Sequence, residues 1–329
     1  MSVTIIFGGQ YGDEGKGKVA HYFTVKENAK YCVRVGGPNS DHSVYNNNKK
    51  ILFHTLPTGI IEKGTIAVLP AGSYIDLDIL KHEIEVSGIS KDRLLIDENA
   101  VIICNEYKVM AKESDSFERI GSINSGTGIA VASRLARLSK KILAKHCAEL
   151  KEYISDTKRV LRMACLKNEK IIIEGTQGYG LSVLHSKEYP YTTSRDTSAS
   201  GFLSETGLSP FDVENIVMVI RAFPIRVSGN SGPLKNEISW DILKKELGCT
   251  ESIEEYGACG KRLHRIARFD EDVVKRSIEC NRPNIIVLNH LDLFPNYKTN
   301  LNSIINELED KIGQKIDYYG DAPNKLLKT

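Results

Sequence analysis

The chain has 329 residues, of which 41% are hydrophobic and 26% are charged, and its formal net charge is +2. These values are typical of an ordinary soluble protein, and the small net charge argues against a nucleic-acid partner. Neither a run of 18 apolar residues nor a signal-peptide pattern occurs, so we expect a cytoplasmic protein without a membrane partner.

The seven cysteines indicate ordinary reduced thiols. None of them form a C-x-x-C pair, and no histidine lies at zinc-site spacing from them. Reduced cysteines are the usual state in a cytoplasmic chain. Cys259 differs from the others because it lies in a glycine-rich basic loop, described below.

Short runs rich in β-branched residues predict eight strands. In chain order these are Val3–Phe7, Tyr31–Val35, Ile51–Phe53, Ile66–Leu69, Arg93–Ile96, Lys170–Glu174, Ile216–Ala222 and Asn284–Leu288. Several runs are almost continuously apolar, as expected of parallel strands that are buried on both faces. A polar turn over Asn46–Lys50 predicts a hairpin.

Seven helices are predicted between and after these strands. They cover Gly17–Val25, Asp76–Ser87, Ala130–Lys145, Glu149–Leu166, Asp241–Leu247, Asp270–Glu279 and Ser303–Ile312. Strands and helices that alternate in this way indicate a doubly wound sheet. Because no linker divides the chain, we expect a single α/β domain over residues 1–329, with a large, mostly parallel central sheet flanked by helices and with loop excursions.

The first predicted strand leads into a glycine-rich loop, Gly8–Lys18, before a predicted helix. Glycines let the backbone approach a ligand closely, and free N–H groups at a helix start bind phosphate oxygens. The spacing G-x4-G-K over residues 12–18 is that of a P-loop, but Val19 stands where Ser or Thr would bind Mg²⁺. We therefore expect a P-loop-NTPase-like fold whose phosphate loop is of a different kind, with Asp13 available for metal or proton chemistry. A solvated Gly/Lys turn is the alternative.

A second cluster, Gly36–Ser43, follows the second predicted strand and should lie at the same sheet edge as the first loop. His42 in this cluster has a side chain suited to general acid catalysis near neutral pH. A lone histidine is more often a core or surface residue, but the Gly36-Gly37 context favours a functional role.

A third cluster, Ile120–Gly128, opens a predicted helix that carries Arg134 and Arg137, and its hydroxyls and helix N–H groups suit a second anion site. A helix cap with solvated arginines is an equally good interpretation. Four further clusters, weaker by themselves, are Glu174–Gly178 with Tyr189–Ser194, Arg226–Pro233, the cationic loop Gly257–Arg265, and Asn289–Asp292 at a strand end.

Taken together, these segments resemble the adenylosuccinate synthetase family. The likeness is carried, in chain order, by Gln10–Lys18, Gly36–Ser43, Glu174–Gly178, Tyr189–Ser194, Arg221–Val227 and Glu255–Arg265, so it extends over essentially the whole chain. The first segment is the most specific. The short chain is similar to the compact archaeal and phage branch, which includes the phage 2-amino-deoxyadenylosuccinate synthases.

The family joins L-aspartate to C6 of a 6-oxopurine mononucleotide, usually IMP, with GTP and Mg²⁺. The resemblance implies that the purine O6 is phosphorylated first and that the aspartate amine then displaces phosphate. It implies that Asp13 removes the N1 proton and ligates Mg²⁺, and that His42 is the acid that supports phosphoryl transfer. Lys16 would hold the triphosphate and Gln177 would position the activated base.

The resemblance also implies three groups of binding residues. The donor nucleotide would contact Gly12, Gly15, Lys16, Gly17, Lys18, Ser43, Asn289 and Asp292. The acceptor nucleotide would contact Asn39, Ser122, Arg137, Gln177, Thr193 and Arg262, with Arg137 supplied across a homodimer interface. Aspartate would contact Cys259, Arg262 and Arg265, and the backbone of Asp41 would join Asp13 at the metal.

Some positions depart from the family pattern. Ser122-Ile123 replaces a pair of threonines, Leu263 and His264 interrupt a run of arginines, and His290 replaces a lysine, so the donor is expected to be either GTP or ATP. Such changes resemble the phage relatives that aminate dGMP, yet those relatives tend to lose the acid that is intact here as Asp13. We expect IMP as the acceptor, with (d)GMP as the alternative and a catalytically altered nucleotide sensor as the second alternative.

Overall fold

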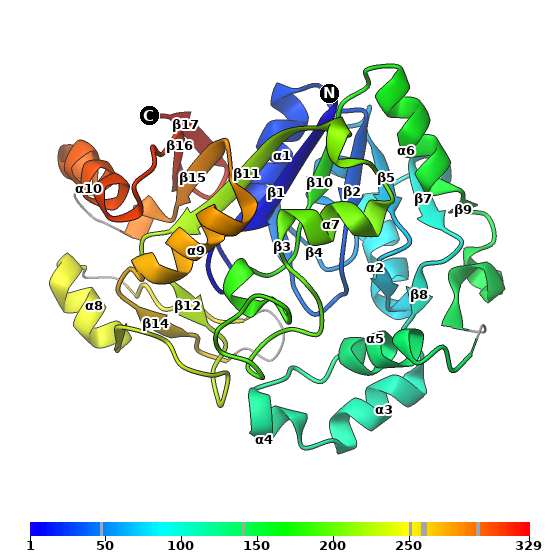
Figure 1. Ribbon diagram of the computed structural model, residues 1–329, viewed down its shortest axis with the longest axis horizontal. Helices are drawn as coiled ribbons and strands as arrows, with labels where there is room; N and C mark the ends of the chain where they lie inside the picture. The colour runs from blue at the N-terminus through cyan, green and yellow to red at the C-terminus, as the bar shows by residue number, and fades with distance from the viewer. Residues whose placement is uncertain (47–48, 140–141, 250–251, 258–261, 294–296) are drawn as a thin grey trace.

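The computed structural model describes the chain except for residues 47–48, 140–141, 250–251, 258–261 and 294–296, and its centre is a ten-stranded sheet (Figure 1). From one edge to the other the strands are β17 (Lys325–Lys328), β16 (Tyr318–Ala322), β15 (Ile285–Asn289), β11 (Val213–Arg221), β1 (Val3–Gly8), β10 (Ile171–Glu174), β2 (Tyr31–Arg34), β5 (Ile66–Leu69), β7 (Leu94–Asp97) and β9 (Ile154–Ser155). Neighbouring strands are parallel except β16 and β17. The predicted α/β fold with a mostly parallel sheet is confirmed.

Helices lie on both faces of this sheet. The helices of the described residues are α1 (Lys16–Lys26), α2 (Leu77–Ser87), α3 (Asn105–Glu113), α4 (Ser116–Ile120), α5 (Thr127–Leu135), α6 (Thr157–Leu166), α7 (Ala199–Thr206), α8 (Trp240–Leu247), α9 (Glu271–Asn281) and α10 (Tyr297–Ile312). Figure 1 shows α7 and α9 in front of the sheet.

The alternation of side chains along β1 explains the two layers. Ile5 and Phe7 belong to a core that includes residues of α6, α7, α9 and α10. Ile6 belongs to a second core with Val19 and Phe23 of α1. Successive strand residues point to opposite faces, so a run of apolar residues without alternation fits a strand covered on both sides.

Three small sheets extend from the central one. β3 (His42–Asn46) and β4 (Lys49–Phe53) form the predicted hairpin, although turn residues 47–48 lie outside the described residues. β12 (Ile225–Arg226), β14 (Arg265–Ala267) and β13 (Glu237–Ile238) form an antiparallel sheet. β6 (Tyr74–Ile75) pairs with β8 (Val101–Ile102).

Three helix predictions were wrong in extent, one of them because α10 begins at Tyr297 and not at Ser303. The helix predicted over Ala130–Lys145 ends at Leu135, because Arg137 adopts a left-handed φ of 56° and the apolar Leu135 and Leu138 stay exposed. The helix predicted from Glu149 begins at Thr157, where the Asp156 carboxylate accepts a hydrogen bond from the Arg159 N–H at 3.0 Å. Ile154–Ser155 pairs with β7 as strand β9 instead.

Candidate functional site

The chemistry-bearing loops meet at one edge of the central sheet. β1, β2, β10, β11 and β15 are parallel neighbours in this sheet, so their carboxyl ends lie at the same edge (Figure 1). The predicted clusters that follow these strands are thereby brought together. They are the Gly8–Lys18 loop, Gly36–Ser43, Glu174–Gly178 and Asn289–Asp292.

A buried carboxylate holds the phosphate loop in shape. Oε1 of Glu14 accepts hydrogen bonds from the N–H groups of Gln10 and Gly12, at 3.1 and 2.9 Å. Oε2 of Glu14 lies 2.6 Å from Nζ of Lys16, and both side chains are buried. The Lys16 ammonium is therefore paired inside the protein.

The start of α1 presents backbone N–H groups without a side-chain cap. Gly15 has a φ of 85° and no side chain there accepts from the first turn of α1. Gly12 has a φ of 100° and Asp13 a φ of 56°, so the loop turns through left-handed backbone conformations that glycine tolerates and other residues rarely adopt. Such a turn before a helix start is a binding site for phosphate.

Two neighbouring strand ends anchor this loop. The Gln10 amide exchanges two hydrogen bonds with the main chain of Arg221 at the end of β11, at 3.0 and 2.9 Å. The Arg221 guanidinium, which is fully buried, donates to the main-chain oxygen of Asp13 at 3.0 Å. From the end of β15, Nδ2 of Asn289 donates to the Glu14 main-chain oxygen at 2.8 Å. The left-handed backbone at Asp13 is thus held by contacts from the ends of both β11 and β15.

The Asp13 carboxylate is accessible and electrostatically perturbed. Its side chain is 45% exposed, so a ligand can reach it. The surrounding loops nevertheless withdraw water from the carboxylate and raise the pKa of Asp13, an effect that His264 opposes and Asp41 reinforces. Nε2 of His264 lies 3.6 Å from Oδ2 of Asp13.

His42 is part of a buried charged cluster at the ends of β2 and β10. Oε1 of Glu174 contacts Nδ1 of His42 and accepts a hydrogen bond from Arg34 at 2.7 Å. Oε2 of Glu174 accepts from the N–H and the hydroxyl of Thr58, both at 2.8 Å. Arg34 also contacts Nδ1 of His42, so Nδ1 is the ring nitrogen held inside this cluster and Nε2 is left to face other groups.

Burial and the Arg34 charge lower the pKa of His42 to about 3, against the opposing effect of Glu174. The imidazole is therefore neutral at neutral pH. A Cβ on Gly17 would lie 2.8 Å from Cβ of His42, which places the ring beside the start of α1. Negative charge bound at that helix start would favour the imidazolium, the form that can donate from Nε2.

Other predicted donor-side residues lie near the C-terminal strands. Nζ of Lys18 donates to the Ala322 main-chain oxygen at 3.0 Å, and burial lowers the pKa of Lys18 to about 8 while Asp292 opposes the shift. Asn289 is fully buried and Asp292 is exposed. Lys18 therefore connects α1 to β16 and β17 in this state. The main-chain oxygen of Ser43 lies 3.0 Å from where a Cβ on Gly17 would be.

The residues predicted to bind the acceptor nucleotide lie in several separate parts of the structure. Gln177 has a φ of 60°, and its main-chain atoms approach Gly8 and Gly12 of the phosphate loop. Asn39 lies against Gly37 after β2. The Ser122 hydroxyl accepts from the Asn124 N–H at 3.2 Å, and the Thr193 N–H donates to the Leu181 main-chain oxygen at 2.9 Å. Arg137 is exposed on the surface.

The cationic loop is held by contacts within the chain. The Arg262 guanidinium lies 4.3 Å from the centre of the Phe117 ring. Arg265 pairs with Glu237 and donates to the Gly232 main-chain oxygen at 2.6 Å. Cys259, predicted to contact aspartate, lies outside the described residues.

Several residues of this site were not singled out by the sequence. Arg34 and Thr58 lie in no recognisable motif, and Glu174 and Glu255 belonged to recognised segments but were given no role. The one available signal was the strand-end position of Arg34 and Glu174, because polar side chains at the carboxyl ends of parallel strands commonly line a site. Thr58 and Glu255 reach the site only through tertiary packing.

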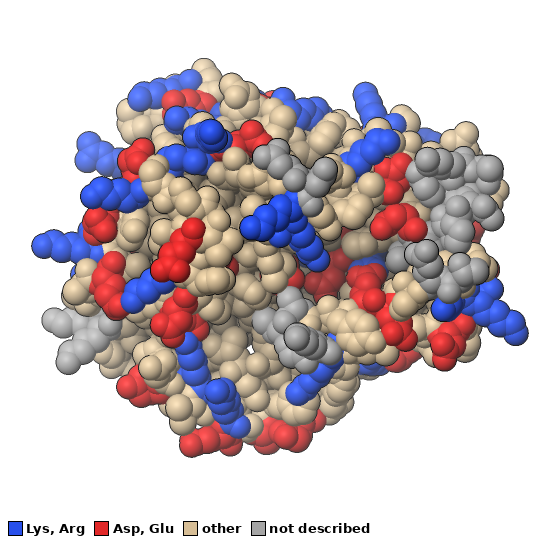
Figure 2. Space-filling model, turned by 180° about the vertical axis from the view of Figure 1, so that it is seen from behind, with Lys and Arg blue, Asp and Glu red and all other residues tan. Residues whose placement is uncertain are grey.

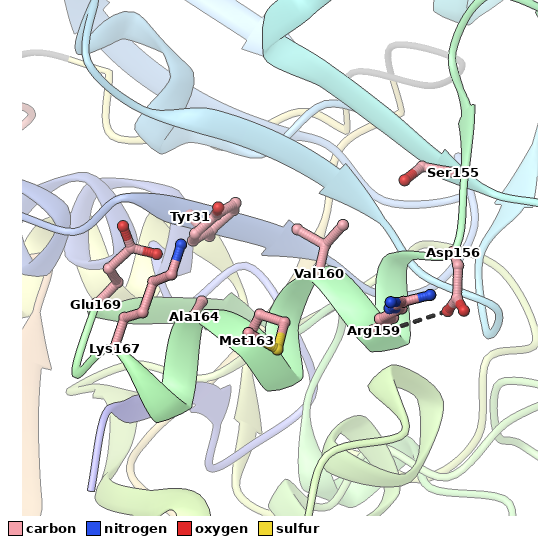
Figure 3. A pocket seen from close by; sticks show the side chains of 9 residues that line it. All are labelled: Tyr31, Ser155, Asp156, Arg159, Val160, Met163, Ala164, Lys167 and Glu169. Carbon is pink, nitrogen blue, oxygen red and sulfur yellow. Dashed lines mark hydrogen bonds between the residues drawn. The ribbon is translucent and has the colours of Figure 1, made fainter.

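Two hollows lie elsewhere on the protein. One, with a volume of about 380 Å³, is lined by Tyr31 of β2 and by α6 residues such as Arg159 and Met163 (Figure 3). The other lies next to it, around Lys30 and Glu169. Both are at the amino ends of the strands, opposite the edge that carries the loops, so neither belongs to the site described here.

The surface charge and the character of the helices are both compatible with a site for small molecules. On the face opposite to that in Figure 1, Lys and Arg side chains are interspersed with Asp and Glu side chains (Figure 2). Among the described residues, no helix has the length and apolar character needed to cross a bilayer.

Comparisons with known proteins agree with the motifs and the fold. A family model described as adenylosuccinate synthetase matches residues 5–146 and 139–304. The adenylosuccinate synthetase of Methanococcus aeolicus is 35% identical over 337 residues, which cover 98% of this chain and 97% of that protein. That of Methanocaldococcus jannaschii is 33% identical over 335 residues, covering 100% and 94%.

Two solved structures have the same fold. Fully ligated adenylosuccinate synthetase from Plasmodium falciparum has a TM-score of 0.88 at 22% identity and covers 100% of this chain and 99% of that one. Cyanophage S-2L succinoaminodeoxyadenylate synthetase (PurZ), bound to dGMP and dATP, has a TM-score of 0.85 at 26% identity, with 100% and 95% covered. With the family model and the archaeal relatives matched over nearly the whole chain, this protein belongs to the adenylosuccinate synthetase family.

Proposed function

We propose that this protein is a C–N ligase that condenses L-aspartate with C6 of IMP, driven by hydrolysis of GTP or ATP. The observation that carries the proposal is that an accessible carboxylate and a buried histidine–carboxylate pair lie at the same edge of the sheet. Asp13 projects from the phosphate loop, and His42 with Glu174 lies beside the start of α1. The archaeal relatives named adenylosuccinate synthetase supply the choice of reaction.

The chemistry has two requirements that these residues meet. The purine O6 is a poor leaving group, so it must first become a phosphate ester, which requires the N1 proton to be removed. Asp13 is the proposed base, and its raised pKa brings it closer to the range in which a carboxylate accepts a proton at neutral pH. Negative charge then develops between the donor and O6, where backbone N–H groups, Lys16 and a protonated His42 would stabilise it.

The residues present also fit Mg²⁺, although no group of three or more acidic, histidine or cysteine side chains that could hold a metal occurs in the described part of the chain. Mg²⁺ is commonly held by one or two carboxylates together with substrate phosphates and water. Asp13 and Asp41 are close enough for Asp41 to raise the pKa of Asp13, and both reach solvent. We infer that they would hold the ion, which when bound would neutralise charge on the donor phosphates.

A homodimer is part of the proposal. Arg137 is exposed, and the adjacent Leu135 and Leu138 are 74% and 72% exposed, so this stretch presents apolar surface beside a cation. Such a surface fits contact with a second copy that receives Arg137 at its acceptor phosphate. A cytoplasmic location accords with a reaction on intracellular nucleotides.

An isotope experiment tests the proposed route. IMP labelled with ¹⁸O at O6 would be incubated with aspartate, Mg²⁺ and GTP or ATP. If O6 is phosphorylated before aspartate attacks, the label appears in the released phosphate and succinyl-AMP is formed. Release of unlabelled phosphate, or release that does not depend on aspartate, would contradict the proposal and favour a nucleotide sensor or a simple NTPase.

A further inference from the structure

His264 stands out because it is a buried histidine that faces the Asp13 carboxylate. It directly precedes strand β14 of the small antiparallel sheet and is 7% exposed. Nε2 of His264 is 3.6 Å from Oδ2 of Asp13, which is ion-pair range but longer than a hydrogen bond. Nδ1 of His264 is buried and has no hydrogen-bond partner among the described residues.

The main chain of His264 is fixed on both sides. Its N–H donates to the Glu255 main-chain oxygen at 2.9 Å, and its own main-chain oxygen accepts from Nε1 of the buried Trp240 at 2.7 Å. The Glu255 carboxylate in turn pairs with Arg221, which donates to the Asp13 main chain. The imidazole and the Asp13 backbone are therefore held by one connected set of contacts.

Nothing else in the described residues contacts the Asp13 carboxylate so closely from the side of the cationic loop. Arg265 is occupied by Glu237, and Arg262 lies over the Phe117 ring. His264 is thus the group that can set the direction of the carboxylate, while Arg221 sets the direction of the Asp13 main chain.

We propose that His264 is a positioning residue that orients the Asp13 carboxylate toward the acceptor base through Nε2–H. This inference rests on the proposed function, in which Asp13 removes the N1 proton. The contact would shorten when the acceptor is bound, because catalytic contacts are often long in ligand-free enzymes. Misplacing a reacting group by about 1 Å costs about 10²-fold in rate.

Two substitutions distinguish the roles of the two ring nitrogens of His264. His264→Gln keeps an N–H donor near the position of Nε2, whereas His264→Asn keeps one only near Nδ1. We expect His264→Asn to lower kcat by about 10²-fold with KM for IMP changed by less than about 3-fold, and His264→Gln to recover most of that loss. His21→Asn is the matched control, because it removes another histidine–carboxylate pair, between His21 on α1 and Glu62, and it should leave kcat unchanged.

Crystal structures of both variants give a readout that does not depend on turnover. The Asp13 side chain should lose its single orientation in His264→Asn and keep it in His264→Gln. Equal losses of kcat in the two variants, or an unchanged Asp13 orientation in His264→Asn, would overturn the proposal. If the wild-type protein forms no succinylated purine, the proposed reaction fails, and the Asp13 orientation alone decides whether His264 positions it.

Discussion

Glu174 at the end of β10 holds His42 at the start of β3 through a buried contact with Nδ1, although the two residues are 132 positions apart in the chain. The contact fixes the orientation of the imidazole by its Nδ1 edge, which the Arg34 guanidinium also contacts. It also separates the task of holding the ring from the task of donating a proton, which falls to Nε2. Glu174 thus contributes to the proton chemistry through His42, without contacting the substrate itself.

Glu174→Gln tests this arrangement. The amide cannot accept from Arg34, His42 and Thr58 together, so we expect kcat to fall by about 10- to 100-fold and the protein to lose about 3 kcal/mol of stability. Enzyme kinetics and thermal unfolding measure the two effects.

The matched control for this change is Glu83→Gln. Glu83 is also buried and accepts hydrogen bonds from the N–H groups of Thr55 and Leu56, at 3.1 and 2.8 Å, but it lies outside the site. It should lower stability without lowering kcat. Equal kcat losses in both variants would mean that Glu174 acts only through folding.

Asp13→Asn tests the proposed base. Asparagine tolerates the left-handed φ of 56° at this position, so the loop should keep its shape. We expect turnover to fall by at least about 10²-fold, the range that general base catalysis supplies, with an unchanged melting temperature. A variant with near wild-type kcat would remove Asp13 from the proton chemistry.

Asp292→Ala tests the donor site. Asp292 is exposed beside Lys18, and a carboxylate there can accept from N1–H and the 2-amino group of guanine. We expect kcat/KM for GTP to fall relative to that for ATP, measured by competition. Asp310→Ala, on the exposed side of α10, is the control and should leave the ratio unchanged. The same ratio in Asp292→Ala would place the donor base elsewhere.

The stability of the protein should decrease in mild acid. Burial and the Arg221 charge lower the pKa of His290 to about 3, and His42 is shifted in the same direction. Between pH about 6.5, where an unfolded histidine titrates, and pH about 3, the unfolded chain binds more protons than the folded one, so stability falls as pH falls.

His290→Asn removes one of these two histidines. Asparagine also suits the φ of 64° at this position. The melting temperature should fall less between about pH 7 and about pH 5 in the variant than in the wild-type protein. Parallel curves would show that His290 is not held neutral in the folded state.

Mixing two inactive variants tests whether Arg137 acts across a dimer. In a hybrid of Asp13→Asn and Arg137→Ala subunits, one of the two sites would contain both natural residues. Random exchange should therefore restore about a quarter of the wild-type activity. No recovery, with exchange verified by native mass spectrometry, would place Arg137 outside the partner's site.

Most strands of the central sheet were predictable because buried parallel strands have nearly continuous apolar sequences. Val3–Phe7 and Ile216–Ala222 coincide closely with β1 and β11. The ends of helices were less predictable: Leu135 and Leu138 continue an apolar period that the structure leaves exposed. β16 and β17 were missed because Tyr318–Ala322 contains Gly320 and Asp321, which are uncommon in strands.

For the site, local motifs identified the phosphate loop and His42, since their residues are close in sequence. The partners that hold them were not predictable. Arg34, Glu174 and Thr58 come from three separate segments, and Arg221 reaches Asp13 across 208 residues. His264 was visible only as a departure from the family's arginines, and its contact with Asp13 required the fold.

The most direct test of the proposed function is a competition assay read by mass spectrometry. The protein would receive IMP, GMP and dGMP together, with aspartate, Mg²⁺, GTP and ATP. The account predicts succinyl-AMP as the main product, dependent on aspartate. A succinylated 2-aminopurine nucleotide as the main product, or no succinylated purine at all, would contradict it.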